Sequence, residues 1–221
     1  MKKINGILIV DGISCFPVSW LSSRDFCEYQ LYLEKIKNVR VEKTIEMVMG
    51  SEIHKKLEEE FLLKVTEKMS IWDSLEISKK EYRSFLVREL EVVSKRYGIY
   101  GKIDEVQIFP DKILIIDDKP GKKVYNGVKK QVWGYALCFI DQFNPDRDVF
   151  TAVRSTDDGE FSWKEKFDEN SADLVLNDIL EIHDLIKEVR VPKSTLNLNK
   201  CGRCRFREVC DRCLVKAPAG K

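Results

Sequence analysis

Two neighbouring segments in the middle of the chain, GIYGKIDEVQIF (98–109) and DKILIIDDK (111–119), constrain the fold most strongly. The first alternates apolar and polar residues, and the second is a short apolar run that ends in charged residues. Both patterns are typical of β-strands. Pro110 and Asp111 lie between the segments and mark a turn. The two segments are therefore expected to form an antiparallel hairpin.

The expected hairpin brings ionisable side chains together. If the turn is centred between Pro110 and Asp111, Asp104 lies opposite Asp117, at the distance of cross-strand neighbours. Lys119 shares this face because residues two apart on a strand point the same way, and Asp118 points to the other face. Two adjacent carboxylates suit Mg²⁺ or Mn²⁺. The alternative is a solvent-facing strand end at which Lys119 simply neutralises the two aspartates.

The remaining elements predict a mixed α/β fold, in which helices flank a central mixed sheet. Strands are expected at DVFTAVRS (148–155) and GEFSWKEKF (159–167), joined by a turn at Asp158 and Gly159. Amphipathic patterns predict helices over 19–37, 43–70, 73–97, 126–142 and 171–190. The chain is expected to form one domain over 1–221, with a helical part at about 18–97, an α/β core at about 98–190 and a cysteine-containing segment at 191–215.

The seven cysteines indicate a metal site in a reducing compartment, because their number is odd and they gather near one end of the chain. No apolar run has the length of a membrane span. A cytoplasmic location is therefore expected. The net charge of +1 gives no indication of nucleic-acid binding, so any basic surface must be local.

Four of the cysteines lie in CGRCRFREVCDRC (201–213). Cys201, Cys204, Cys210 and Cys213 form two CxxC pairs, which is a zinc-binding pattern. The gap between the pairs is short for a zinc knuckle, however, and Cys27 in an early helix is left without a role. Cys15 and Cys138 are expected to be small buried residues.

Several isolated polar residues are candidates for the same site as the two aspartates. His54 lies on an expected helix, and imidazole is a common metal ligand. Gln131 and Tyr135 are four apart and share a helix face. Each of these also fits an ordinary surface or buried polar position. A lysine-rich stretch that begins after the hairpin suits nucleic-acid phosphates, although such stretches are often only solvated; its members are Lys122, Lys123, Lys129 and Lys130.

Taken in order, these residues resemble the RecB-like branch of the PD-(D/E)XK nucleases. The resemblance rests on the helical His54, then GKID with Asp104, then IIDDK with Asp117 and Lys119, then Gln131 and Tyr135 as QxxxY. Cys27 followed far downstream by CxxCxxxxxC is similar to the iron–sulfur members of this branch. These include the CRISPR-associated exonuclease (the fourth Cas protein), the AddB nuclease domain and exonuclease V. The resemblance spans roughly residues 18 to 213.

The resemblance implies a metal-dependent DNA exonuclease, acting 5′-to-3′ on single-stranded DNA and in some members also as an endonuclease, in CRISPR spacer acquisition or DNA repair. It implies that Mn²⁺ or Mg²⁺ is bound by His54, Asp104, Asp117 and the backbone carbonyl of Asp118. Lys119 would be catalytic, together with the two metal-binding aspartates, and Gln131 and Tyr135 would position the lysine or the DNA.

The resemblance also implies a [4Fe–4S] cluster held by Cys27, Cys201, Cys204 and Cys210, since such clusters commonly take four thiolates. Zinc and a [2Fe–2S] cluster remain alternatives, and Cys213 would be a bystander. DNA is the implied partner, with CRISPR integrase subunits and a second copy of the chain as further candidates. Asp117 stands where the family usually has Glu, which leaves a non-catalytic DNA- or partner-binding module as the alternative function.

Overall fold

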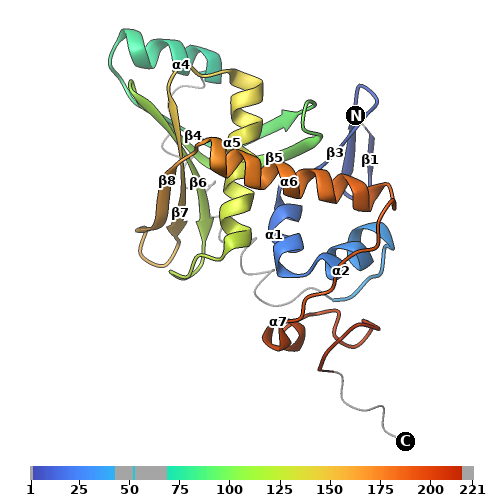
Figure 1. Cartoon of the computed structure of the whole chain (residues 1–221). Helices are drawn as coiled ribbons and strands as arrows, with labels where there is room; N and C mark the ends of the chain where they lie inside the picture. The colour runs from blue at the N-terminus through green and yellow to red at the C-terminus, as the bar shows by residue number, and fades with distance from the viewer. Residues whose placement is uncertain (1, 43–51, 53–68, 216–221) are drawn as a thin grey trace, which may run out of the picture.

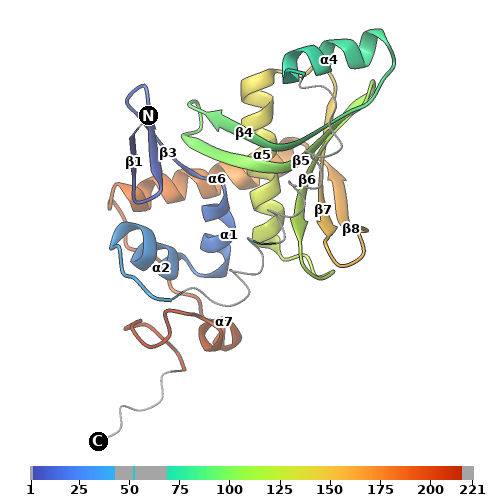
Figure 2. The same cartoon turned by 180° about the vertical axis from the view of Figure 1, so that it is seen from behind.

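The computed structural model describes residues 2–42, 52 and 69–215. An eight-stranded sheet runs through the described chain, in the order β1-β2-β3-β5-β6-β7-β8, with β4 paired to the other edge of β5. Helices pack against this sheet (Figures 1 and 2). The α/β class, with a mixed sheet flanked by helices, is therefore confirmed.

The first three strands form an N-terminal antiparallel meander: β1 (Lys2–Ile4), β2 (Ile7–Val10) and β3 (Ile13–Pro17). Its two turns are Asn5–Gly6 and Asp11–Gly12, and all four residues have positive φ angles, between 48° and 87°. Asn-Gly and Asp-Gly are the sequences that such tight hairpin turns favour. The pattern analysis had not predicted these strands, although both dipeptides signal them.

The second half of the sheet contains the predicted hairpin. Strand β5 pairs antiparallel with β4 along its length and with β6 at its C-terminal end; β7 pairs parallel with β6 and antiparallel with β8. The bounds are β4 (Phe85–Ser94), β5 (Ile99–Ile108), β6 (Lys112–Lys119), β7 (Asp148–Ser155) and β8 (Phe161–Lys166). The strands predicted from the sequence at 98–119 and 148–167 are thus present.

The described helices are α1 (Ser19–Phe26), α2 (Glu28–Leu31), the π-helical turn η1 (Tyr32–Ile36), α4 (Ile71–Lys80), α5 (Asn126–Phe143), α6 (Glu169–Ile186) and α7 (Leu198–Gly202). Helix α5 lies along one face of the sheet, and α6 crosses it on the side away from the strands (Figure 1). None of the described helices is long and apolar enough to cross a membrane.

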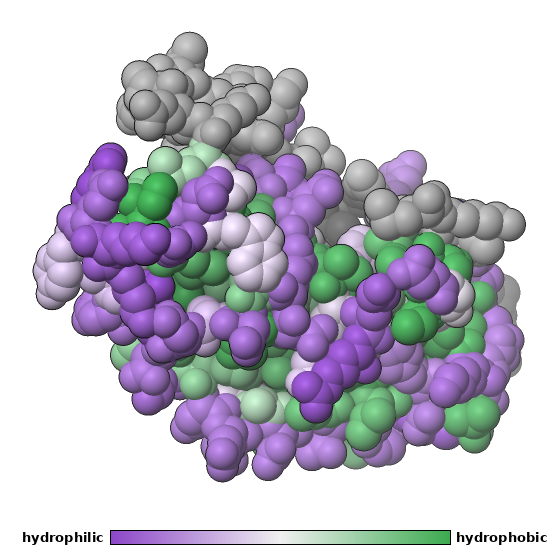
Figure 3. Space-filling model, turned by 90° about the horizontal axis from the view of Figure 1, so that it is seen from above, coloured by the Kyte–Doolittle hydropathy of each residue, from purple (hydrophilic) through white to green (hydrophobic). Residues whose placement is uncertain are grey.

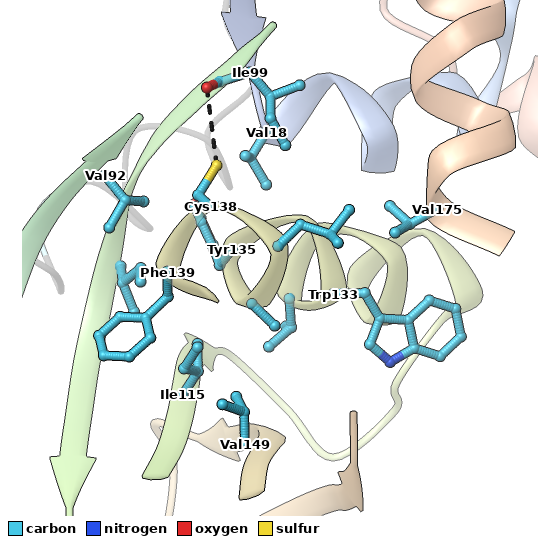
Figure 4. Packing of buried hydrophobic residues seen from close by; sticks show 14 of the residues in the cluster. Val18, Val92, Ile99, Ile115, Trp133, Tyr135, Cys138, Phe139, Val149 and Val175 are labelled. Carbon is cyan, nitrogen blue, oxygen red and sulfur yellow. Dashed lines mark hydrogen bonds between the residues drawn. The ribbon is translucent and has the colours of Figure 1, made fainter. Parts of the chain in front are cut away.

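Helix α5 and the sheet enclose the main core. Ile115 of β6 points toward α5, and Phe139 and Cys138 fill the space beneath β5 (Figure 4). Ile113 belongs to the same buried cluster. The Cys138 thiol donates to the Ile99 carbonyl over 3.8 Å, and Cys15 is fully buried as well, so both cysteines are core residues as predicted. The described surface seen from above is mostly hydrophilic, with smaller hydrophobic areas between (Figure 3).

Two helix predictions need correction. The predicted helix at 73–97 is wrong beyond Lys80: Tyr82 takes a left-handed φ of 52°, and the chain continues as β4. Pairing with β5 at nine positions outweighs the helical spacing of the apolar residues there. The predicted helix at 19–37 is interrupted at Cys27, whose backbone is extended, and continues as α2 and η1. The predicted helix at 43–70 falls almost entirely outside the described residues.

Candidate active site and cysteine pocket

The candidate site lies where β6 separates from β5. One edge of β5 pairs with β3 at Ile99 and Tyr100, and with β6 from Glu105 onward. Between these contacts, residues 101–104 pair with no described strand on that edge. Gln131 and Tyr135 of α5 lie beside the opening. Side chains at the end of β6 can therefore reach into it without breaking the sheet.

Asp104, Asp117 and Lys119 meet in this opening. The hairpin has the predicted register, since Glu105 pairs with Ile116 and Ile108 with Ile113. The Asp104 Oδ2 accepts a hydrogen bond from the Asp118 backbone N–H over 2.7 Å. The Lys119 Nζ lies 2.6 Å from the Asp117 Oδ2. The structure thus brings together the three residues that the sequence placed on one face.

Burial and like charge dominate the electrostatics of this group. Asp104 is 9% exposed and Asp117 is 1% exposed. Burial, followed by repulsion from Asp117, raises the pKa of Asp104 well above its ordinary value. Burial alone would lower the pKa of Lys119, but attraction to Asp117 and Asp104 outweighs it and raises that pKa. The lysine therefore stays positively charged, and the acidic pair has a strong preference for a nearby cation.

Helix α5 contributes Gln131 and Tyr135, as predicted. The Gln131 Nε2 donates to the Asp117 Oδ1 over 3.0 Å and lies 3.4 Å from the Tyr135 hydroxyl. Burial and the two nearby carboxylates raise the pKa of Tyr135, so the phenol stays protonated. Gly101 makes room for this ring, because a Cβ at Gly101 would lie 2.5 Å from a ring carbon of Tyr135. The glutamine amide fixes the orientation of the Asp117 carboxylate.

An ion network that the sequence analysis missed lies on the opposite face of the sheet. The Asp118 carboxylate points there, as predicted, and accepts from Arg154 over 2.8 Å and Arg88 over 3.0 Å. Both arginines also bind Glu105. These hydrogen bonds lower the pKa of Asp118 against the opposing effect of burial. The alternation that placed Asp118 on this face could have predicted a buried cationic partner.

The buried carboxylates form a partial donor set for a divalent cation. The Asp117 Oδ2 is buried and lies 2.6 Å from the Lys119 Nζ, and it accepts no hydrogen bond from any other described group. Carboxylate and carbonyl oxygens suit Mg²⁺ and Mn²⁺. No three histidine, cysteine, aspartate or glutamate side chains in the described part form a group that could hold a metal. The predicted additional ligand, His54, lies outside the described residues.

The predicted nucleic-acid-binding lysines have different surroundings. The Lys130 Nζ is paired within the protein, 2.7 Å from the Asp178 Oδ2. Lys122 pairs with Asp158 at the surface. Lys129 lies over the ring of Trp163, and Lys123 lies over that of Tyr125. Lys123 is the one of the four that lines an open groove, shared with α7.

Five cysteines line one pocket between α2 and the C-terminal segment: Cys27, Cys201, Cys204, Cys210 and Cys213. The cavity left between these side chains has a volume of about 20 Å³. Burial raises the pKa of the Cys204 thiol, and the neighbouring thiols at 27, 210 and 201 raise it further. All seven cysteines of the chain are free. The fold thus brings Cys27 to the C-terminal cysteines across more than 170 residues of sequence.

Comparison with known proteins gives a family match. A family model described as exonuclease V, a 5′ deoxyribonuclease, matches residues 11–131, which is more than half of the chain. No curated protein matches the chain by sequence.

One solved structure shares the fold at low sequence identity, and a second is similar to a lesser degree. A candidate exonuclease from Eubacterium rectale has a TM-score of 0.52 at 13% identity, covering 93% of this chain and 91% of that one. An alkaline exonuclease from Laribacter hongkongensis has a TM-score of 0.45 at 10% identity, covering 79% of this chain and 89% of that one.

Proposed function

The chain belongs to the exonuclease V family and is a nuclease, and we propose that it degrades single-stranded DNA from the 5′ end during CRISPR spacer acquisition or DNA repair. One observation carries the proposal: Asp104, Asp117 and Lys119 converge at the opening between β5 and β6. Two buried carboxylates beside a charged lysine suit phosphodiester hydrolysis. The compartment would be the cytoplasm.

Asp104, Asp117 and the backbone carbonyl of Asp118 would hold Mn²⁺ or Mg²⁺, with His54 as a further ligand. A cation bound there supplies Lewis acidity and lowers the pKa of a bound water. Lys119 would neutralise charge that develops on the phosphate oxygens during attack. Gln131 would keep the Asp117 carboxylate in one orientation, and Tyr135 would limit access of bulk water behind it.

We propose that the cysteine pocket holds a [4Fe–4S] cluster through Cys27, Cys201, Cys204 and Cys210. Such clusters commonly take four thiolates, and these four cysteines line one pocket, although they do not form a ready-made metal-holding group among the described residues. Its role would be structural, joining α2 to the C-terminal segment. Cys213 lines the same pocket and is the candidate for a substitute ligand. CRISPR integrase subunits and a second copy of the chain are proposed partners.

The test compares Asp117→Asn and Lys119→Ala with Asp111→Asn, which removes an exposed carboxylate from the β5–β6 turn. Each protein is incubated with Mn²⁺ and an oligonucleotide blocked at either its 5′ or its 3′ end. We expect the first two variants to lose cleavage by about 100-fold or more, and the control to retain it. A 3′ block should leave degradation intact.

Degradation at the unmodified rate by either site variant would contradict the assignment of the site. Sensitivity to a 3′ block alone would contradict the proposed polarity. Unmodified protein that binds DNA and leaves it intact would support a non-catalytic binding module instead.

A further inference from the structure

An open groove of about 670 Å³ runs between the loop that follows β6 and helix α7. Lys123 and Tyr125 line one side, and Asn199, Lys200 and Arg203 line the other. The first side begins four residues after Lys119, and the second includes Lys200, which precedes Cys201. Lys200 lines the cysteine pocket as well, so the groove adjoins that pocket.

The groove has a net positive charge. Arg203 and Lys123 are exposed, and neither forms an ion pair with the described residues. The Lys200 Nζ donates to the Asp25 backbone carbonyl over 2.7 Å and lies 4.0 Å from the Asp25 Oδ2. Asp25 is the acidic residue of the lining, and Lys130 already contacts it at 3.4 Å. The groove thus has two cationic side chains without an ion pair and one carboxylate that is already neutralised. This excess of positive charge suits a polyanionic ligand.

An aromatic ring stands beside these cations. Tyr125 precedes the first residue of α5 and is 55% exposed, so one face of its ring can be reached from the groove that it lines. The Lys123 Nζ lies 5.0 Å from the ring centroid. Single-stranded nucleic acids bind to sites that combine a cationic groove for phosphates with an exposed ring on which a base stacks. In a duplex the bases are already stacked and would not be available to Tyr125.

We infer that this groove binds single-stranded DNA on its way to or from the cleavage site, with phosphates at Lys123 and Arg203 and one base on Tyr125. The inference rests on the proposed function for its choice of DNA as ligand. It adds a path for the DNA strand, which would run from the loop after β6 to α7. The path would make correct placement of the C-terminal segment a condition for substrate binding.

The experiment measures fluorescence anisotropy of a labelled 20-nucleotide oligo-dT with the full chain, in EDTA so that no hydrolysis occurs. Tyr125→Leu should weaken binding by about tenfold, the effect of losing one stacked base, and Tyr125→Phe should retain it. Arg203→Ala should weaken binding and make the slope of log affinity against log salt less steep by about 0.7, the value for one phosphate contact to a single strand. Duplex DNA of the same length should respond weakly to Tyr125→Leu.

Two variants serve as matched controls. Arg96→Ala removes a charge from the turn between β4 and β5, and Tyr82→Leu removes a ring that is 83% exposed near α4. Both should bind oligo-dT like the unmodified protein. The inference would be overturned if the groove variants also bound oligo-dT normally, or if the unmodified protein failed to bind it. It would also be overturned if the groove variants lost duplex and single-strand binding equally. Groove-dependent binding without any cleavage in Mn²⁺ would contradict the proposed function alone.

Discussion

Asp118 connects the two faces of the sheet at the level of a single residue. Its backbone N–H fixes the Asp104 carboxylate on the α5 side, while its own carboxylate is held by Arg88 and Arg154 on the other side. A shift of this residue toward either face would move Asp104. The ion network is therefore expected to control the position of the candidate site as well as the stability of the sheet.

Replacing Arg88 with Met tests this connection. The Arg88 side chain is 6% exposed, and its loss leaves Glu105 and Asp118 sharing Arg154 alone. Removal of one partner from a buried ion pair costs about 3–5 kcal/mol. We expect the free energy of unfolding, measured with urea, to fall by that amount. We also expect the remaining folded protein to cleave DNA more slowly.

Arg83→Met is the matched control, because Arg83 pairs with Glu81 at the surface and is 60% exposed. This substitution should change the free energy of unfolding by no more than about 0.5 kcal/mol. Equal stability of the two variants would show that the network contributes nothing beyond a surface ion pair.

At the scale of elements, alternation predicted the β5–β6 hairpin to the residue because one side of it is buried against α5. A shift of register by one residue would have turned Ile113 and Ile115 away from the core. Strand β4 was missed because its apolar residues also fit a helix, and only the pairing with β5 decides between the two. The Arg88 network was missed for the same reason: it depends on which strand lies beside β5.

Helix α6 offers a test of pH dependence. The Asp168 Oδ1 caps it by accepting from the Ser171 N–H over 2.8 Å, and these hydrogen bonds lower the pKa of Asp168. A carboxyl group with a lowered pKa stabilises the fold above its unfolded pKa of about 3.9, and this stabilisation is lost as the pH falls through the lower, folded value. The Tm of Asp168→Ala should therefore lie below that of the unmodified protein at pH 7, and the gap should narrow below about pH 4.

Asp173→Ala removes an exposed carboxylate within the same helix and should change the Tm little at pH 7. If the difference in Tm between Asp168→Ala and the unmodified protein is the same at pH 7 and pH 3, the capping explanation is refuted.

The break between α1 and α2 has a consequence for the proposed cluster. Cys27 has an extended backbone at the break and lines the cysteine pocket, whereas a continuous helix would have fixed its direction by helical geometry. Cys27→Ser should therefore abolish iron binding, as measured by iron content and visible absorption after anaerobic purification. Cys213→Ser should retain iron. The opposite result, or four zinc-binding cysteines within 201–213, would favour a self-contained zinc knuckle.

Over the whole molecule, the C-terminal segment is held to the N-terminal helices by a set of buried contacts. Glu28 accepts two hydrogen bonds from Arg190 at 2.8 Å and one from the Lys193 N–H. Tyr29 adds a hydrogen bond to Asp211 over 2.6 Å. In Figures 1 and 2 the segment lies beside α2, away from most of the sheet. These contacts position the cysteine pocket and one wall of the groove together.

Glu28→Gln removes the charge at the centre of these contacts while keeping the size of the side chain. Glu28 is 6% exposed, and hydrogen bonds to charged groups contribute about 1.5–3 kcal/mol each. Because Glu28 makes no contact on which the sheet core depends, the loss of stability should be confined to the C-terminal segment. Hydrogen–deuterium exchange should become faster across residues 190–213 and stay unchanged in β5 and β6.

Glu76→Gln is the control, since Glu76 lies on the surface of α4 and its side chain is 63% exposed. It should leave exchange in both regions unchanged. Oligo-dT binding should fall in Glu28→Gln, because Arg203 moves with the loosened segment. If Glu28→Gln exchanges faster but binds oligo-dT normally, α7 does not form a wall of the DNA path. If its exchange is unchanged, the cysteine pocket, and not Glu28, holds the C-terminal segment in place.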